Sequence, residues 1–149
     1  LINGTPSGFF PSERGLRQGD PLSPFLFILA MGALSDMLKT AQTNNWIRGF
    51  KLNENDPVNL SISHLQYADD TLVFCGAEEE QLKYLRIIFI LFEAISGLHV
   101  NWGKSFVYPV NEVPNIGGLV NILRGRIGEL PTTYLGMPLG EKSKSKNIW

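Results

Sequence analysis

The stretch that most constrains this chain runs from Leu65 to Phe74, where two adjacent aspartates separate two short apolar segments. Both flanks are rich in residues that favour β-strands, so the pattern predicts an antiparallel hairpin with Asp69 and Asp70 at its apex. A two-residue hairpin turn usually contains Asn-Gly or Asp-Gly, because its residues need positive φ angles. Ala68 and Asp69 are poorer choices. A turn that departs from the local rule is expected at a functional site.

The paired carboxylates indicate a metal site. Two neighbouring carboxylates repel each other, and a divalent cation removes that repulsion. Carboxylate oxygens suit Mg²⁺, which keeps waters and takes phosphate oxygens as further ligands. Two such ions can hold the attacking and leaving oxygens of a phosphoryl transfer. The hairpin therefore predicts Mg²⁺ binding by Asp69 and Asp70, and a solvated Asp-Asp turn without a function is the alternative.

The bulk composition sets limits on partners and compartment. The chain has 149 residues, 44% of them hydrophobic, which is enough for one domain with a core. Its net charge of −1 counts against a self-sufficient nucleic-acid binder, because phosphate neutralisation usually requires a basic excess. One cysteine excludes an internal disulfide and fits a reducing, intracellular compartment. No apolar run has membrane-spanning length, so we expect no membrane partner.

Two helical patterns accompany the hairpin. Apolar residues recur at three- and four-residue steps over 24–41 and 78–96, and each set predicts one buried face. The first face comprises Leu26, Leu29, Ala30, Ala33, Leu34, Met37 and Leu38, and the second Leu82, Leu85, Phe89, Phe92 and Ile95. Glu78 to Glu80 suit the N-terminal dipole of the second helix, and Gly97 suits its end. We expect an α+β fold, with one antiparallel sheet and both helices on one face of it.

A glycine-rich loop precedes the first helix. Gly15 and Gly19 permit close backbone approach, and Arg17 and Gln18 offer donors for phosphate or sugar oxygens. Ser23 is predicted as the N-cap, with Pro24 in the first turn. A glycine loop that leads into a helix N-terminus suits an anion, although it can also simply connect to the helix.

Other segments are predicted from turn and strand patterns. Hairpins are expected at 1–11 and at 129–140, the second with Gly136 near its turn, and a short helix at 115–124. Strands are expected near 46–52 and 60–64, with a turn at 53–57 between them, and a polar linker at 141–149. Lys104, in a loop beside a strand at 106–108, could approach a phosphate or be a solvated surface lysine. We expect His64 to be packed or hydrogen-bonded rather than to ligate a metal.

Four blocks of this sequence together resemble the reverse transcriptase domain of LINE-type, non-LTR retrotransposons. They occur in the order and spacing of that family and span nearly the whole chain. The blocks are Gly15-Leu16-Arg17-Gln18-Gly19-Asp20-Pro21-Leu22-Ser23-Pro24, His64-Leu65-Gln66-Tyr67-Ala68-Asp69-Asp70, Ser96-Gly97-Leu98-His99-Val100-Asn101-Trp102-Gly103-Lys104-Ser105 and Tyr134-Leu135-Gly136-Met137-Pro138-Leu139-Gly140.

The resemblance implies a role for each matching residue. Asp69 and Asp70 match the catalytic, metal-binding pair, and Tyr67 supports their turn. Gln18 and Gly19, with Arg17 nearby, match residues that meet the incoming nucleotide and the template. Lys104 matches a lysine proposed to protonate the pyrophosphate leaving group. Tyr134, Leu135 and Gly136 match the hairpin that grips the primer end. The implied partners are an RNA template, a DNA primer and a dNTP, and the implied cofactor is two Mg²⁺ ions.

The chain departs from the family pattern in one respect. The family carries a third carboxylate on a strand upstream of the glycine-rich block, and fingers and a thumb outside this segment. The resemblance therefore implies an incomplete palm at 1–140, followed at 141–149 by a linker toward a thumb. Two ligands from one hairpin hold Mg²⁺ weakly, because the ion prefers a near-ideal octahedron. We expect an isolated chain without polymerase activity, with an open sheet edge that favours marginal stability or self-association.

Two alternatives remain open at this point. One is a catalytically dead remnant, or binding module, that keeps the palm scaffold. The other is a group II intron maturase fragment, from a related polymerase that serves RNA splicing. The 14–24 and 134–140 blocks favour the retrotransposon interpretation.

Overall fold

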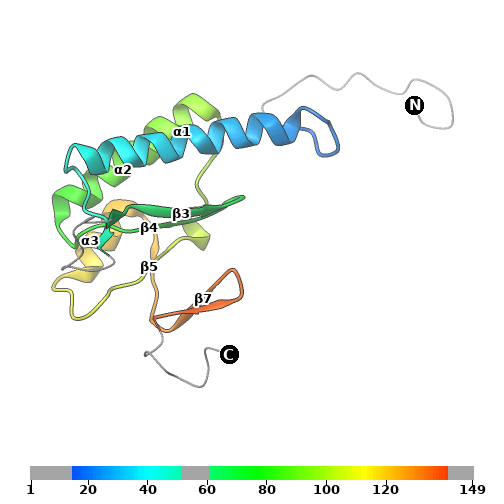
Figure 1. Cartoon of the computed structure of the whole chain (residues 1–149). Helices are drawn as coiled ribbons and strands as arrows, with labels where there is room; N and C mark the ends of the chain where they lie inside the picture. Colours follow the sequence, from blue (N-terminus) through cyan, green and yellow to red (C-terminus); the bar gives the residue numbers. More distant parts are fainter. Residues whose placement is uncertain (1–14, 52–60, 141–149) are drawn as a thin grey trace, which may run out of the picture.

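A computed structural model describes residues 15–51 and 61–140 of the chain. Two long helices, α1 (Ser23–Thr43) and α2 (Glu79–Ser96), run antiparallel to each other and lie on one side of a hairpin formed by β3 (His64–Tyr67) and β4 (Asp70–Val73) (Figure 1). A third helix, α3 (Ile116–Leu123), packs against α2. A second hairpin, of β7 (Thr132–Tyr134) and β8 (Met137–Leu139), lies on the side of β3–β4 away from α1 and α2. The expected α+β class, with both helices on one face of the aspartate hairpin, is confirmed.

The expectation of one continuous antiparallel sheet is wrong for the described residues. Four separate two-stranded sheets are present instead, and the pairing of β5 (Phe106–Val107) with β6 (Arg126–Ile127) is parallel. The remaining pair joins β1 (Phe50–Lys51) to β2 (Ser61–Ile62). Each strand is only two to four residues long, at the short end of the usual range.

The core lies where α1, α2 and the end of α3 meet. It contains mostly aliphatic side chains from these helices and from the segment that follows α1, namely Leu34, Leu38, Ala41, Ile47, Leu82, Leu85, Ile88, Phe92 and Leu123. Burial of these side chains is the main stabilising contribution here, at about 25 cal/mol for each Å² of apolar surface removed from water.

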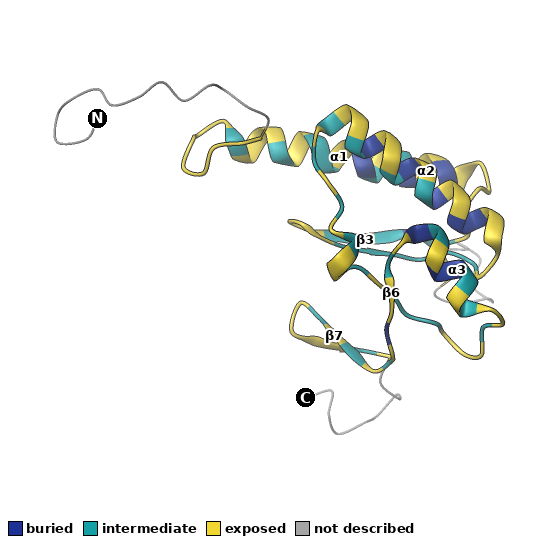
Figure 2. Cartoon of the chain, turned by 180° about the vertical axis from the view of Figure 1, so that it is seen from behind, coloured by how far each residue is buried: buried dark blue, intermediate teal, exposed yellow. Residues whose placement is uncertain are grey.

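The predicted buried faces are correct over most of α2 and over the C-terminal half of α1, and they are wrong elsewhere, including at Ala33, which is exposed. Leu26 and Leu29 on α1, and Ile95 on α2, are exposed. In Figure 2 the N-terminal turns of α1 extend past the rest of the molecule, and few of their residues are buried. Helical periodicity defines which residues share a face, but burial also requires a neighbouring element, and among the described residues none covers these turns.

The helix α1 also passes the length and hydropathy test for a membrane span, contrary to the expectation from the sequence. Its 21 residues include a window with a mean hydropathy of 1.3, of which 17% is buried. The helix carries Asp36 and Lys39, and its C-terminal half packs on α2 and β3. This half contributes Leu34, Leu38 and Ala41 to the core, whereas most of the window is exposed.

The helix ends follow the local chemistry with one difference. Gly97 adopts φ +71° at the end of α2, as predicted, and Glu79 and Glu80 occupy the first turn. Ser23, in contrast, is the first helical residue of α1, and its hydroxyl donates to Arg17 O at 2.8 Å instead of capping the helix. Leu22 is the N-cap residue, and no side chain caps the helix. The Asp20 carboxylate accepts from Leu22 N at 2.9 Å in the loop that precedes the helix.

Some expectations fall on segments outside the described residues. These are the hairpin at 1–11, the turn at 53–57 and the linker at 141–149. The expected strands near 46–52 and 60–64 correspond to β1 and β2, and the expected helix at 115–124 corresponds to α3.

Candidate functional site

The β3–β4 hairpin presents the two aspartates as the sequence predicts. Tyr67 pairs with Asp70, which leaves Ala68 and Asp69 as a two-residue turn. Ala68 has φ +50°, in the left-handed region that non-glycine residues rarely adopt. Asp69 thus occupies the turn, and Asp70 is the first residue of β4; both are exposed.

The two faces of this hairpin differ in what they contact. His64, Gln66, Thr71 and Val73 share the face toward the helices, because alternate residues of a strand point to the same side. Ser35 Oγ on α1 lies 2.8 Å from His64 Nε2, and Ser63 Oγ lies 2.9 Å from Nδ1. Burial lowers the pKa of His64, and the charge of Lys39 lowers it further. The ring is therefore a neutral, hydrogen-bonded link to α1, as expected.

Two buried polar atoms next to the aspartates have no hydrogen-bond partner within 15–51 and 61–140. They are Gln66 Nε2 and Thr71 Oγ1, on residues that face each other across the hairpin. A buried polar group without a partner costs about 1–3 kcal/mol. Sequence reasoning missed this pair, since nothing in the pattern separates a polar residue on the covered face from one on the open face.

Tyr134 connects the second hairpin to the first. Its hydroxyl lies 3.4 Å from Asp70 O and 3.5 Å from Leu65 O, within long hydrogen-bonding distance of both carbonyls. Partial burial raises the pKa of Tyr134, and the negative charge of Asp70 raises it further. The sequence placed Tyr134 in a primer-binding hairpin but did not predict its contact with the backbone of Asp70, which lies 64 residues away in the chain.

The turn of the second hairpin has the predicted position. Tyr134 pairs with Met137, so Leu135 and Gly136 form a two-residue turn, with φ of +51° and +79°. Positive φ at both positions is typical of a type I′ turn. Leu135 and Gly136 are both exposed at its tip.

Lys104 lies on a 3₁₀ turn, η1 (Trp102–Lys104), rather than in an irregular loop. The Asn101 side chain accepts from Lys104 N, and Trp102 packs edge-on against Phe89 of α2, with 5.5 Å between ring centroids. The guanidinium of Arg86 lies 4.7 Å above the Trp102 ring. Lys104 itself is exposed, and both views place this turn on the side of β3–β4 where β7–β8 lies.

The glycine-rich loop is ordered by its own backbone. Gly15 and Gly19 have φ of +124° and +85°, and Arg17 O accepts from Asp20 N as well as from the Ser23 hydroxyl. Arg17, Gln18 and Gly19 are exposed. The structure places this loop at the end of α1 toward which the β3–β4 turn points, but no hydrogen bond within the described residues joins the loop to Asp69 or Asp70.

The donor set suits a hard cation but is small. Asp69 and Asp70 offer exposed carboxylate oxygens, the ligand type that Mg²⁺ prefers. In the part of the chain that the structure describes, no three His, Cys, Asp or Glu side chains come together. Asp69 and Asp70 therefore fit Mg²⁺ as part of a ligand set, with water and substrate oxygens as the other ligands.

A comparison with protein families identifies the scaffold. The reverse transcriptase (RNA-dependent DNA polymerase) family matches residues 1–139. This chain belongs to the reverse transcriptase family. Members of the family bind an RNA template, a primer and a dNTP, and generally use Mg²⁺. The match covers both hairpins, η1 and the glycine-rich loop.

The chain is also similar to a plant protein. An uncharacterized mitochondrial protein of Arabidopsis thaliana is 48% identical over 116 residues, which cover 76% of this chain and 90% of that protein. No solved structure matches the chain.

Proposed function

We propose that this chain carries part of the nucleotidyl-transfer centre of an RNA-directed DNA polymerase, within an incomplete palm at 1–140. The observation that carries the proposal is the exposed Asp69–Asp70 turn, whose strand backbone is contacted by Tyr134 from a second hairpin. The second hairpin and η1, which carries Lys104, lie on the side of β3–β4 away from α1 and α2, and on this proposal the template–primer duplex binds on that side.

In this proposal Asp69, Asp70, Lys104 and Tyr67 serve the chemical step. Asp69 and Asp70 hold Mg²⁺, which when bound stabilises the attacking 3′-oxygen of the primer and the leaving pyrophosphate. The 3′-hydroxyl loses its proton to solvent, and its oxygen forms a bond to the α-phosphorus. The bond between the α-phosphorus and the oxygen that bridges to the β-phosphorus breaks, which releases pyrophosphate. Lys104 supplies a proton to the leaving pyrophosphate, and Tyr67 supports the turn.

The remaining site residues position the substrates. Arg17, Gln18 and Gly19 meet the incoming nucleotide and the template, with Arg17 suited to bidentate contact with a phosphate. Tyr134, Leu135 and Gly136 bind the primer end. The contact of Tyr134 with Asp70 O holds the primer-binding turn at a constant position relative to the aspartates.

The 149-residue chain on its own is proposed to lack polymerase activity. Its described residues offer two carboxylates from one turn, which leave most of an octahedral Mg²⁺ shell to water. We assign the subtype as LINE-type, non-LTR, from the four sequence blocks, rather than as a group II intron maturase. The RNA template and the single, half-buried Cys75 both suit an intracellular compartment.

A test of metal binding distinguishes the proposal from the alternative. A chain that keeps the nucleotidyl-transfer centre should bind a divalent cation at Asp69 and Asp70, whereas a catalytically dead remnant should not. We would titrate Mn²⁺, as a paramagnetic stand-in for Mg²⁺, into ¹⁵N-labelled chain and follow the loss of amide signals. The loss should be greatest at Ala68, Asp69 and Asp70, excess Mg²⁺ should reverse it, and Asp69→Asn should abolish it.

The control is Asp36→Asn, which removes an exposed carboxylate of α1 and should leave the Mn²⁺ effect at the turn unchanged. Equal signal loss in the wild type and in Asp69→Asn would rule out the metal site. Primer extension with an RNA template, dNTPs and Mg²⁺ should give no product from the chain alone. A product that disappears on Asp69→Asn would overturn the proposed inactivity.

A further inference from the structure

Parts of α1 and α2 are unusually apolar for a surface exposed to water. From Ile87 to the end of α2, every exposed residue is apolar: Ile87, Ile90, Leu91, Ala94 and Ile95. From Pro24 to Ala33, the exposed residues of α1 are likewise apolar or glycine. A helix that faces water normally carries charged or polar residues on that side.

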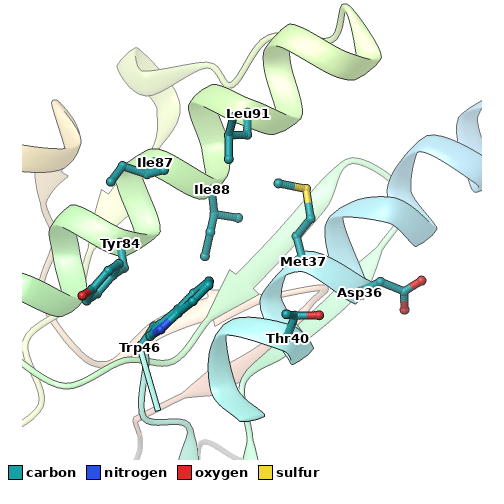
Figure 3. A pocket seen from close by; sticks show the side chains of 8 residues that line it. All are labelled: Asp36, Met37, Thr40, Trp46, Tyr84, Ile87, Ile88 and Leu91. Atoms are coloured by element: carbon teal, nitrogen blue, oxygen red, sulfur yellow. The ribbon is translucent and has the colours of Figure 1, made fainter. Parts of the chain in front are cut away.

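One end of this surface is hollow. A groove of about 290 Å³ lies between the two helices, and Figure 3 shows Met37 and Trp46 reaching toward Ile88 across it. The Trp46 and Tyr84 rings stack at its end, with 5.7 Å between centroids and 16° between planes. The rim carries one charged side chain, that of Asp36.

The other end of the surface projects. Leu29 and Ile95 are 71% and 76% exposed. Tyr84, Leu91 and Ile95 are separated by seven and four residues, so they lie along one face of α2 from the groove to the projecting end. We define the outer helical face as Leu29, Trp46, Tyr84, Ile87, Leu91 and Ile95.

We infer that the outer helical face is a homodimer interface, which brings α1 and α2 of two copies together as four helices. A two-fold interface requires that one patch be complementary to itself. A two-fold axis near Leu91 places the projecting Ile95 of each copy over the Trp46–Tyr84 groove of the other. The groove at one end of the outer helical face and the projecting Ile95 at the other end meet that requirement.

The exposed area agrees with a stable dimer. Taking about 200–250 Å² for a fully exposed large apolar residue, the outer helical face exposes roughly 700 Å². A standard interface buries about 800 Å² per partner, and the largest apolar patch on a typical monomer is about 300–600 Å².

The chemistry of this surface disfavours other occupants. Nucleic acid requires cations opposite its phosphates, and no basic residue lies on the outer helical face. A helix bound at a membrane surface typically has lysine and arginine along its polar side. Dimerisation through this face also leaves the Asp69–Asp70 turn free, because the turn and β7–β8 lie on the opposite side of the molecule.

Sedimentation velocity over a wide range of chain concentrations tests the inference. The wild type should form dimers, and Ile95→Glu should raise the dissociation constant by at least about a hundredfold, because symmetry places two charges in an apolar interface. The matched control is Val110→Glu, at a position 69% exposed outside the outer helical face, and it should dimerise like the wild type. Circular dichroism would verify that both variants keep their helices.

A second measurement needs no disruptive substitution. Leu91→Cys should form a disulfide-linked dimer under mild oxidation, and Val110→Cys should not. Burial raises the pKa of the native Cys75 thiol to about 11, so that thiol should contribute little. A wild type that stays monomeric, dimers that persist in Ile95→Glu, or binding of monomers to lipid vesicles would each overturn the inference. Persistence in Ile95→Glu would instead indicate pairing through an open sheet edge.

Discussion

Replacing Gln81 on α2 by Met should destabilise the fold, because Gln81 is a buried side chain that joins two segments. Gln81 is buried, and its Oε1 accepts from both Arg48 N and Gly76 N at 2.8 Å. It therefore ties the segment after α1 to the segment that leaves β4. Its amide nitrogen also donates to Glu78, which forms an ion pair with Arg48.

The expected loss of stability comes from the two backbone N–H groups that lose their hydrogen-bond acceptor. Met retains the length and the helix propensity of Gln, so the change removes the acceptor with little loss of packing. Two backbone N–H groups then lose their partner at partly buried positions, which costs about 1 kcal/mol each, or about 2 kcal/mol in total. For a chain of this size that corresponds to a fall in melting temperature of about 4–8 °C.

Urea unfolding, monitored by circular dichroism, measures this difference. The matched control is Gln42→Met, because Gln42 makes one side-chain–backbone hydrogen bond, which it donates from Nε2 to Ser61 O at 3.1 Å. It should cost about half as much, or about 1 kcal/mol. If Gln81→Met costs no more than Gln42→Met, then Gln81 does not join the two segments in the way that the hydrogen bonds indicate.

The other predictions concern residues around the two hairpins. Thr71→Val removes a buried hydroxyl without a partner in the described residues and should stabilise the fold by about 1 kcal/mol in urea unfolding; a loss of stability would mean that the hydroxyl is paired in solution. Ala68→Gly should raise the free energy of unfolding by about 0.5–1 kcal/mol, because glycine adopts the left-handed conformation of Ala68 without strain and this gain exceeds the entropy cost of glycine. An unchanged melting temperature would show that Ala68 is not strained. Gly128→Ala would place a methyl group against the Tyr108 ring and should cost about 1–3 kcal/mol, which a wild-type melting curve would disprove. The lowered pKa of His64 means that the folded state binds fewer protons than the unfolded state, so stability should be full above about pH 6.5 and fall as the pH falls through the folded-state pKa. Unfolding free energies of His64→Gln should lack that part of the pH dependence, and identical pH profiles would refute the assignment.

Both hairpins of the candidate site contain a turn residue in an unfavourable backbone conformation. Each has a two-residue turn with a non-glycine residue at positive φ, Ala68 in one and Leu135 in the other. Ala68 and Leu135 depart from the residue preference for positive φ, whereas Gly136 follows it. His64 links the first hairpin to α1, and Tyr134 links the second hairpin to the first.

Much of the local structure was predictable from the sequence because it depends on neighbouring residues. The Asp69–Asp70 hairpin, the Leu135–Gly136 turn, both long helices and the left-handed Gly97 each follow from periodicity or from backbone preference within a few residues. The matching blocks that indicate a reverse transcriptase are also local, and the family match over residues 1–139 confirms that interpretation.

Only the tertiary structure decided which of these elements meet. The sequence could not show that Tyr134 reaches the backbone of Asp70, that Ser35 pairs with His64, or that Gln81 accepts from Arg48 N, because these contacts join residues 29 to 64 positions apart. Nor could periodicity separate a covered apolar face from an exposed one, as Leu29 and Ile95 demonstrate. Periodicity specifies direction around a helix, whereas burial depends on what the rest of the chain places opposite.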